Sequence, residues 1–244
     1  MTRTPDSAAI VVIGNEILSG KVKDSNSYYL CQELRFLGVD VHRILTVPDE
    51  IDLVGKLVKE YAQQFTWVFT SGGIGPTHDD ITIESIAKAF GVATEESPRL
   101  AQLIRDYYKD RCTPAHLRMA KIPKGAQLLE YETLSAPQLQ FHNIIIFPGI
   151  PELLRERFNG IKEMFRQDPI FLREIFMKID ESLISELLDK TMMNYPALLL
   201  GSYPTLWRKD YTLKLTLESR ETSYLQEAFD YLMDHLPKDK MVQF

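Results

Sequence analysis

With 244 residues, the chain is long enough to bury one sizeable core, or one core with a smaller appended domain. Its hydrophobic fraction of 45% and charged fraction of 25% are ordinary for a soluble globular protein, and the formal net charge of −6 argues against a protein that mainly grips nucleic acid. Two cysteines exclude a disulfide framework or a cysteine-rich zinc cluster, and no apolar run is long enough to span a membrane, so we expect a cytoplasmic location.

The first part of the sequence alternates apolar strands with amphipathic helices. Residues 8–13 are a continuous apolar run that ends at Gly14, as expected for a strand covered on both faces. A stripe of leucines at helical spacing follows and stops at Gly38, a residue type that often ends helices. The next strand is predicted over 39–45, and residues 48–50 then open another helix.

A glycine-rich loop follows the next predicted strand. Residues 67–69 read as the end of a buried strand, and the segment 72–77, here called the glycine loop, leads into a helix. A loop of this kind presents bare backbone N–H groups, which form a natural seat for phosphate. Asp79 and Asp80 close the loop, and because carboxylates repel phosphate, they predict a ligand bridged by a divalent cation. The alternative is that Thr77 or Asp80 only caps the helix.

The middle of the chain gives weaker signals. Residues 97–98 are a serine and a proline that predict the start of a helix. The segment 120–125 is predicted to be a surface turn, and 134–139 is either a hairpin or a loop. Residues 143–147 are again a buried strand, which a proline-rich turn connects to a helix.

This alternation predicts a three-layer α/β/α domain with a mostly parallel sheet over residues 1–168. Ligands of such folds bind beyond the carboxyl ends of the strands. Gly14, Pro48, Gly72 and Pro148 each follow a predicted strand end. We therefore expect the four loops that begin there to share one crevice.

The pattern changes after Asp168. Residues 169–244 predict a small α+β domain with the order β-α-β-β-α. The segment 211–217 alternates polar and apolar residues, so this sheet is expected to have one solvated face. The aromatic and basic segment 203–209 is expected to be an exposed tip, which either stacks on a base, docks a partner or is a solvated hairpin.

Four segments in the same order carry a resemblance to a known family: 14–20 with Asp24 and Asn26, 47–50, 72–82 and 147–152. They resemble the molybdopterin-binding fold of the MoaB/Mog and gephyrin-like enzymes, the CinA N-terminal region and the N-terminal domain of eukaryotic FAD synthase. The first segment looks specifically like the CinA and FAD synthase branch. In the small domain, 200–204 and 214–217 look like the segment that follows in FAD synthases, where CinA has a KH-like unit. The small domain lacks the Gly-x-x-Gly loop with which KH domains clamp RNA, so no nucleic acid is expected as partner.

The resemblance implies a divalent-metal-dependent pyrophosphatase that acts on nucleotide diphosphate compounds such as ADP-ribose or FAD. Two alternatives stay open: binding or adenylation of molybdopterin, as in the Mog branch, and a non-catalytic nucleotide-binding partner module. CinA and FAD synthase commonly continue into a deamidase or an adenylyltransferase domain. This sequence contains neither, so neither activity is expected of it. Relatives of the fold also imply a homo-oligomer, a dimer or a trimer.

The resemblance assigns roles to the acids of the loops. Asp80 occupies the position used for metal and catalysis, and Asp49 occupies a second acidic position, where capping of the next helix is the alternative. The expected ligands of the cation, Mg, Mn or Co, are Asp80, Asp79, Glu16 and Asp24. The expected phosphate-binding or nucleotide-binding residues are Gly14, Asn26, Gly72, Gly73, Gly75, Pro76, Thr77, Thr82, Pro148, Gly149 and Pro151.

Overall fold

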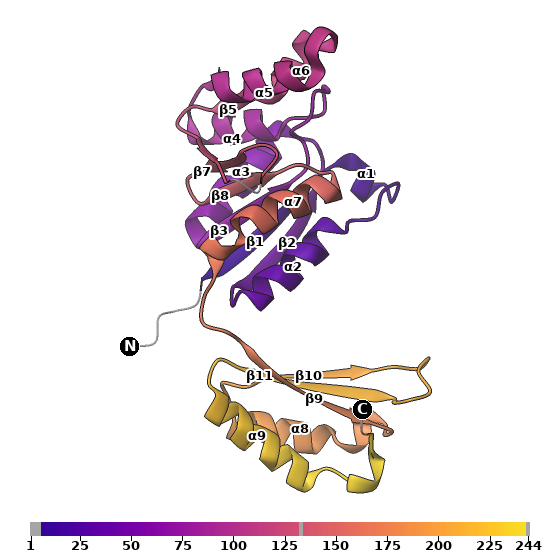
Figure 1. Ribbon diagram of the computed structural model, residues 1–244. Helices are drawn as coiled ribbons and strands as arrows, with labels where there is room; N and C mark the ends of the chain where they lie inside the picture. Colours follow the sequence, from indigo (N-terminus) through magenta and orange to yellow (C-terminus); the bar gives the residue numbers. More distant parts are fainter. Residues whose placement is uncertain (1–5, 132–133, 243–244) are drawn as a thin grey trace. The chain divides into compact units, whose positions relative to one another are not determined.

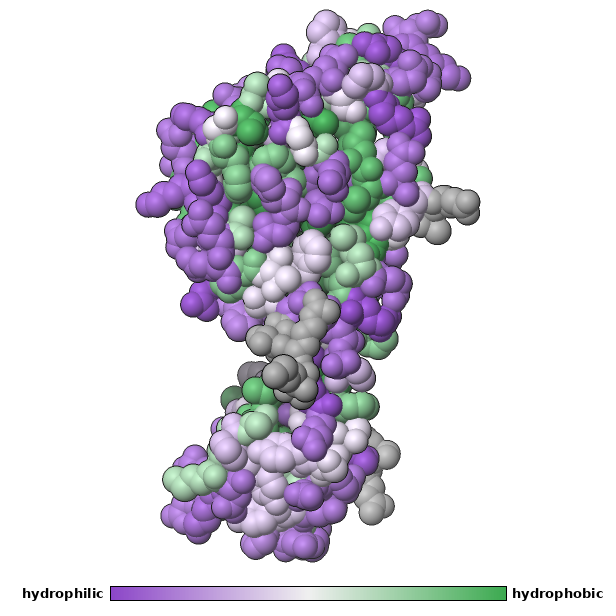
Figure 2. Space-filling view, turned by 90° about the vertical axis from the view of Figure 1, so that its left-hand side faces the viewer, coloured by the Kyte–Doolittle hydropathy of each residue, from purple (hydrophilic) through white to green (hydrophobic). Residues whose placement is uncertain are grey.

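The computed structural model describes residues 6–131 and 134–242 of the chain. They form two compact units, 1–167 and 168–244, which we call the first and second unit. Within the described segments, no helix is long and apolar enough to cross a bilayer. The face seen in Figure 2 is largely hydrophilic on both units, with apolar residues exposed between hydrophilic ones on the first.

The first unit is built on a six-stranded sheet with the strand order β2-β1-β3-β8-β7-β6 (Figure 1). Its strands are β1 (Ser7–Ile13), β2 (Asp40–Val47), β3 (Trp67–Ser71), β6 (Gln127–Leu129), β7 (Gln138–Phe141) and β8 (Ile144–Phe147). The pairs of β1 with β2, of β1 with β3 and of β3 with β8 are parallel, whereas β7 and β6 add an antiparallel edge. The predicted mostly parallel sheet is confirmed.

Helices cover both faces of this sheet (Figure 1). They are α2 (Asn26–Phe36) and α7 (Pro151–Ile161) on one face, and α3 (Ile51–Gln64) and α4 (Thr82–Phe90) on the other. Strand β1 shows why its apolar run is continuous: Ile10 and Val12 join the core under α2 and α7, whereas Val11 and Ile13 join the core under α3 and α4. A strand with helices on both sides needs apolar residues at every position, and the predicted three-layer arrangement is confirmed.

One expectation in the middle of the chain is wrong. The segment 120–125 is not simply a surface turn, because β5 (Lys121–Pro123) pairs antiparallel with β4 (Thr94–Glu96), and Ile122 is buried. Only the residues around Gly125, which has a φ of 88°, make a turn.

The other elements in the middle of the chain are α5 (Pro98–Tyr108), η1 (Lys109–Arg111), α6 (Pro114–Leu117) and η2 (Arg118–Ala120), and η3 (Lys162–Phe165) follows α7. Ser97 caps α5 as predicted, since its side chain accepts a hydrogen bond from the N–H of Leu100.

The second unit is the predicted small α+β domain. Its antiparallel sheet has the strand order β10-β11-β9-β12. The elements in chain order are β9 (Phe171–Met177), η4 (Glu181–Leu183), α8 (Ser185–Asn194), β10 (Leu199–Pro204), β11 (Leu213–Ser219), α9 (Thr222–His235), η5 (Lys238–Lys240) and β12 (Met241–Val242). Leu213, Leu215 and Leu217 of β11 face the core with α9, which explains the alternation in this segment. The short strand β12 was not predicted.

Candidate ligand site at the carboxyl ends of the parallel strands

Four loops leave the carboxyl ends of the parallel strands. They are the β1 loop (14–25), which contains the short helix α1 (Asn15–Leu18), the β2 loop (48–50), the β3 loop (72–81) and the β8 loop (148–150). Backbone hydrogen bonds join them to neighbouring strands: Gly14 N–H donates to the carbonyl of Val47 at 3.1 Å, and Gly72 N–H donates to that of Phe147 at 3.2 Å. The four loops therefore meet at one edge of the sheet.

The glycine loop presents three consecutive backbone N–H groups. Among the described residues, no hydrogen bond engages the amides of Gly73, Ile74 or Gly75. The flanking positions differ, because the Gly72 amide is bonded to Phe147, the Thr77 amide is bonded to Asp80, and Pro76 has no N–H. Within the predicted segment 72–77, the amides of Gly73, Ile74 and Gly75 are therefore the ones that remain open to phosphate.

The conformation of the glycine loop depends on glycine at two positions. Gly72 has a φ of 106° and Gly73 a φ of 66°, and a Cβ atom on Gly72 would lie 2.2 Å from the carbonyl oxygen of Ile13. Thr82 closes the loop, since its hydroxyl donates to the carbonyl of Gly72 and its N–H to that of Gly73, each at 2.9 Å. Thr82 is fully buried and both of these donors shape the loop, whereas the expected ligand contact of Thr82 stays a prediction.

Asp80 lies half-buried at the end of the β3 loop. Its Oδ2 accepts hydrogen bonds from the N–H and the hydroxyl of Thr77, at 2.7 and 2.6 Å, whereas no described residue donates to Oδ1. The carboxylate packs on Gly75, where a Cβ atom would lie 2.6 Å from Oδ2. Helix α4 has no side-chain cap bond at its N-cap residue Ile81, so the capping alternative for Thr77 and Asp80 is not what the structure shows.

Asp49 connects the β2 loop to the β1 loop. Its Oδ2 accepts a hydrogen bond from the backbone N–H of Asn15 at 3.0 Å. It makes no cap bond to α3, whose N-cap residue Glu50 also makes none. Glu16 lies on the same short helix as Asn15, and its carboxylate covers Gly14, since a Cβ atom there would lie 2.4 Å from Oε1. Asp49 therefore connects the β1 and β2 loops, and Glu16 lies beside Gly14 in the β1 loop.

Both carboxylate oxygens of Asp24 accept hydrogen bonds at the start of α2. Its Oδ1 accepts hydrogen bonds from the N–H groups of Asn26 and Ser27, at 2.9 and 3.1 Å, and its Oδ2 accepts from the Ser27 hydroxyl. Both oxygens therefore serve the helix terminus, as the turn chemistry of this segment requires. The structure supports this role rather than the expected metal ligation by Asp24.

Asn26, the first residue of α2, joins the end of β3 to the β8 loop. Its side-chain Nδ2 donates to the hydroxyl of Ser71 at 2.9 Å and to the carbonyl of Gly149 at 2.8 Å. The side chain is 6% exposed, and its Oδ1 has no hydrogen-bond partner among the described residues. The sequence did not single out Ser71. The available signal was a polar residue at the end of an apolar strand.

The other predicted residues differ in their exposure. Asp79 and His78 are exposed and 4.0 Å apart, and hydrogen bonding by Thr77 is the main reason why the pKa of Asp79 lies below its ordinary value. Pro148 is buried behind Gly149. Pro151 is the first residue of α7, a position that proline favours without any ligand.

The carboxylates do not form a ready-made metal centre. Within the described segments, no group of three or more His, Cys, Asp or Glu side chains could hold a metal ion. The segments 47–51, 72–82 and 148–151 contain no lysine or arginine, whereas the β1 loop contains Lys21 and Lys23. The open Oδ1 of Asp80 fits a cation that arrives with the ligand, because Mg²⁺ in proteins is commonly held by one or two carboxylates and the phosphates of the substrate.

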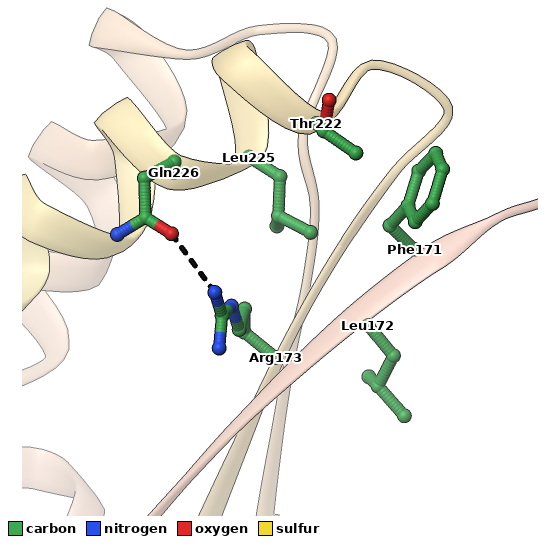
Figure 3. A pocket seen from close by; sticks show the side chains of 6 residues that line it. All are labelled: Phe171, Leu172, Arg173, Thr222, Leu225 and Gln226. Carbon is green, nitrogen blue, oxygen red and sulfur yellow. Dashed lines mark hydrogen bonds between the residues drawn. The ribbon is translucent and has the colours of Figure 1, made fainter.

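The second unit carries two further surface features. Leu206 and Trp207, at the tip between β10 and β11, are 88% and 93% exposed, and the guanidinium of Arg208 pairs with Asp210 and lies 4.7 Å from the ring centre of Tyr211. A pocket of about 240 Å³ is lined by Phe171, Leu172, Arg173, Thr222, Leu225 and Gln226 (Figure 3). The guanidinium of Arg173 donates to Gln226 at 2.9 Å and lies over the ring of Phe229, so its main polar group is already engaged.

Comparison with known proteins gives the family of both units. Residues 9–167 match the family model described as "Probable molybdopterin binding domain", and residues 169–244 match "FAD synthase, middle domain". The chain is 31% identical to a "Probable FAD synthase" of Caenorhabditis briggsae over an alignment of 250 positions, which covers 91% of this chain and 48% of that protein. It is 28% identical over 237 residues to a "CinA-like protein" of Thermotoga maritima, covering 93% of this chain and 58% of that protein.

A solved structure agrees with the first of these matches. The crystal structure of CinA from Thermoplasma acidophilum, described as a protein of unknown function, superposes with a TM-score of 0.60 at 30% identity and covers 66% of this chain and 98% of that one. The chain spans about half the length of the curated FAD synthases that it matches. It belongs to the molybdopterin-binding domain family, with CinA-like relatives, and carries an FAD synthase middle domain after the first unit.

Proposed function

We propose that the first unit binds a nucleotide diphosphate compound in the crevice and hydrolyses its pyrophosphate bond with the help of a divalent cation. One observation carries the proposal. The β3 loop offers three unengaged amides, those of Gly73, Ile74 and Gly75, and within a few residues the open Oδ1 of Asp80. The FAD synthase names among the relatives support a nucleotide cofactor such as FAD as the ligand, with ADP-ribose as an alternative.

The charges at the crevice explain why a cation is part of the proposal. Phosphate oxygens that approach the free amides also approach Asp80, and the segment 72–82 has no basic side chain to offset this repulsion. Asp80 would hold Mg²⁺, Mn²⁺ or Co²⁺ through Oδ1, because Thr77 already occupies Oδ2. When bound, such a cation neutralises phosphate charge and polarises a P–O bond.

Residues of the chain position the phosphate and the Asp80 carboxylate. The free amides bind phosphate oxygens, and Thr77 fixes the orientation of the Asp80 carboxylate. Asp49 holds α1 against the β2 loop and so keeps the β1 loop at the crevice. In the reaction, a water oxygen forms a bond to one phosphorus, the bond from that phosphorus to the bridging oxygen breaks, and two monophosphates form. When both products are dianions, the two hydrogens of the water are released as protons.

Incubation with FAD or ADP-ribose in the presence of Mg²⁺, Mn²⁺ or Co²⁺ tests the proposal. The expected products are AMP with FMN, or AMP with ribose 5-phosphate. Asp80→Asn should lower the rate at least a hundredfold, whereas His78→Ala, at a 96% exposed side chain of the same loop, should retain it. Intact substrate with every cation, in the presence of well-folded protein, would refute the proposed hydrolysis.

A pterin ligand is the second candidate, and the description of the matching family favours it. The same free amides would then bind the phosphate of a molybdopterin-type compound, with adenylation by ATP or binding alone as the activity. Tight pterin binding that ATP competes for, without hydrolysis of FAD or ADP-ribose, is the outcome that would favour this candidate. Ligand binding that survives Asp80→Asn, without turnover of any substrate, would favour a non-catalytic binding module.

A further inference from the structure

Asn26 occupies a central position among the loops of the crevice. It is the first residue of α2, and its N–H is bonded to Asp24 Oδ1, so the helix terminus fixes its backbone. Its side chain leaves the helix and bonds to Ser71, the last residue of β3, and to Gly149 in the β8 loop. These partners are 45 and 123 residues away in the sequence.

The β3 and β8 loops touch at two glycines. A Cβ atom on Gly149 would lie 3.4 Å from the Cα atom of Gly72, and the N–H of Gly72 donates to the carbonyl of Phe147 at 3.2 Å. The spacing between these loops therefore has little freedom on this side. Asn26 connects the same two loops through a second path, one residue before Gly72 and at Gly149 itself.

Both hydrogen atoms of the Asn26 amide group are used within the protein. A carboxamide nitrogen has two donors, and these reach Ser71 and Gly149. The oxygen Oδ1 is buried and lacks a partner among the described residues. A ligand could therefore contact the Asn26 amide group only if one of these bonds broke or the side chain moved.

We propose that Asn26 is a positioning residue that sets the spacing of the β3 and β8 loops and so holds the amides of the glycine loop in the arrangement that binds phosphate. The proposal rests on the function proposed above. It assigns to Asn26 an indirect role, through Ser71 and Gly149, rather than contact with the ligand. Asparagine suits this role because it combines two donors with a short side chain, whereas aspartate of the same shape has no donor when ionised.

A double-mutant cycle with ligand affinity as the readout tests this role. ADP-ribose and FAD serve as probes with Mn²⁺ present, and their affinity is measured by rapid mixing, before hydrolysis proceeds. Asn26→Ala should weaken binding about tenfold or more, and Ser71→Ala should weaken it less, because the bond to Gly149 remains. Since both substitutions remove the same Asn26–Ser71 bond, the double variant should bind no worse than Asn26→Ala alone. Additive losses would overturn the positioning role in favour of separate contacts with the ligand.

Hydrogen exchange of the ligand-free protein gives a second readout that does not depend on activity. In Asn26→Ala, the Gly72 amide, which is bonded to Phe147, should exchange faster, whereas amides of α3 and of the second unit should not change. Unchanged exchange at Gly72 would refute the proposal, whether or not any substrate is hydrolysed. Faster exchange without any hydrolysis would uphold it and leave only the proposed function refuted.

Two variants control for folding. Gln32→Ala removes an exposed side chain of the same helix that bonds to Tyr28, and it should change neither ligand affinity nor exchange at Gly72. If Asn26→Ala does not fold, Asn26→Leu keeps the approximate volume of the side chain and removes both donors. This variant should give the same rise in exchange at Gly72. If the Gly72 amide does not exchange faster in it, the proposal is overturned.

Discussion

The carboxylate of Asp49 accepts a hydrogen bond from the backbone N–H of Asn15 at 3.0 Å, across 34 residues of sequence. This contact brings the loops after two neighbouring parallel strands together at the start of α1. It offers an alternative to the catalytic role that the family resemblance implies for Asp49. The two roles differ in whether they need the negative charge.

A pair of substitutions at Asp49 separates these roles. Asp49→Asn keeps an oxygen that can accept the bond from Asn15, whereas Asp49→Ala removes it. If the residue positions the loop, we expect Asp49→Asn to retain most of the hydrolytic rate, and Asp49→Ala to lose at least tenfold and to cost about 1 kcal/mol of unfolding free energy. Steady-state kinetics and urea denaturation measure both. Equal loss of rate in both variants would instead show that the charge is required.

Gly72→Ala should be strongly destabilising. The new Cβ atom would lie 2.2 Å from the backbone carbonyl of Ile13, at a φ of 106°, so the β3 loop would have to move. We expect a loss of about 3 kcal/mol or more, because strain and displaced backbone add. Gly20→Ala is the matched control, since its φ is 71° but nothing lies within 4 Å, and it should cost only about 1 kcal/mol. Similar losses in thermal and chemical denaturation for both variants would contradict the steric account.

Thr82→Val should lower both the unfolding free energy of the protein and its affinity for the ligand. Valine fills the same space but leaves the buried carbonyl of Gly72 without its side-chain donor. The expected cost is about 1–3 kcal/mol of unfolding free energy. Thr82→Ser keeps the hydroxyl and should retain more of the stability and of the affinity for ADP-ribose. The reverse order of these two variants would show that the methyl group, not the hydrogen bond, matters at this position.

Removal of divalent cations should abolish hydrolysis without affecting the fold. Within the described part of the chain there is no cluster of three potential ligands, so the cation is expected to bind mainly with the substrate. A chelator should therefore leave the midpoint of thermal unfolding unchanged in the absence of ligand, and added Mn²⁺ or Mg²⁺ should restore activity. A large fall in the unfolding midpoint on chelation would point to a structural metal instead.

The sequence predicted those parts of the fold that strong local patterns encode. The apolar runs at 8–13 and 143–147 became buried strands because helices cover both faces of the sheet. The strand at Lys121–Pro123 was missed because three residues are too few for a periodic pattern, and its partner Thr94–Glu96 lies far away in the sequence.

The site was likewise predictable only as far as local sequence patterns reach. The four loops and the residues Asp80 and Asn26 could be found from the order of the motifs and the family resemblance. Their hydrogen-bond partners could not, because the contacts of Asn26 with Ser71 and Gly149 depend on how distant segments meet. For the same reason the sequence did not show that polar atoms of Asp24 and Thr82 bond to the protein itself.

The two tryptophans differ in a way that is useful for spectroscopy. Trp67 packs edge-on against Phe165 at 5.1 Å and its indole N–H donates to Asp6, whereas Trp207 is 93% exposed. The emission of Trp207 is already that of a hydrated indole, so melting of its unit will hardly shift it. A red shift of intrinsic fluorescence during denaturation will therefore report on the unit that contains Trp67, without any engineered label.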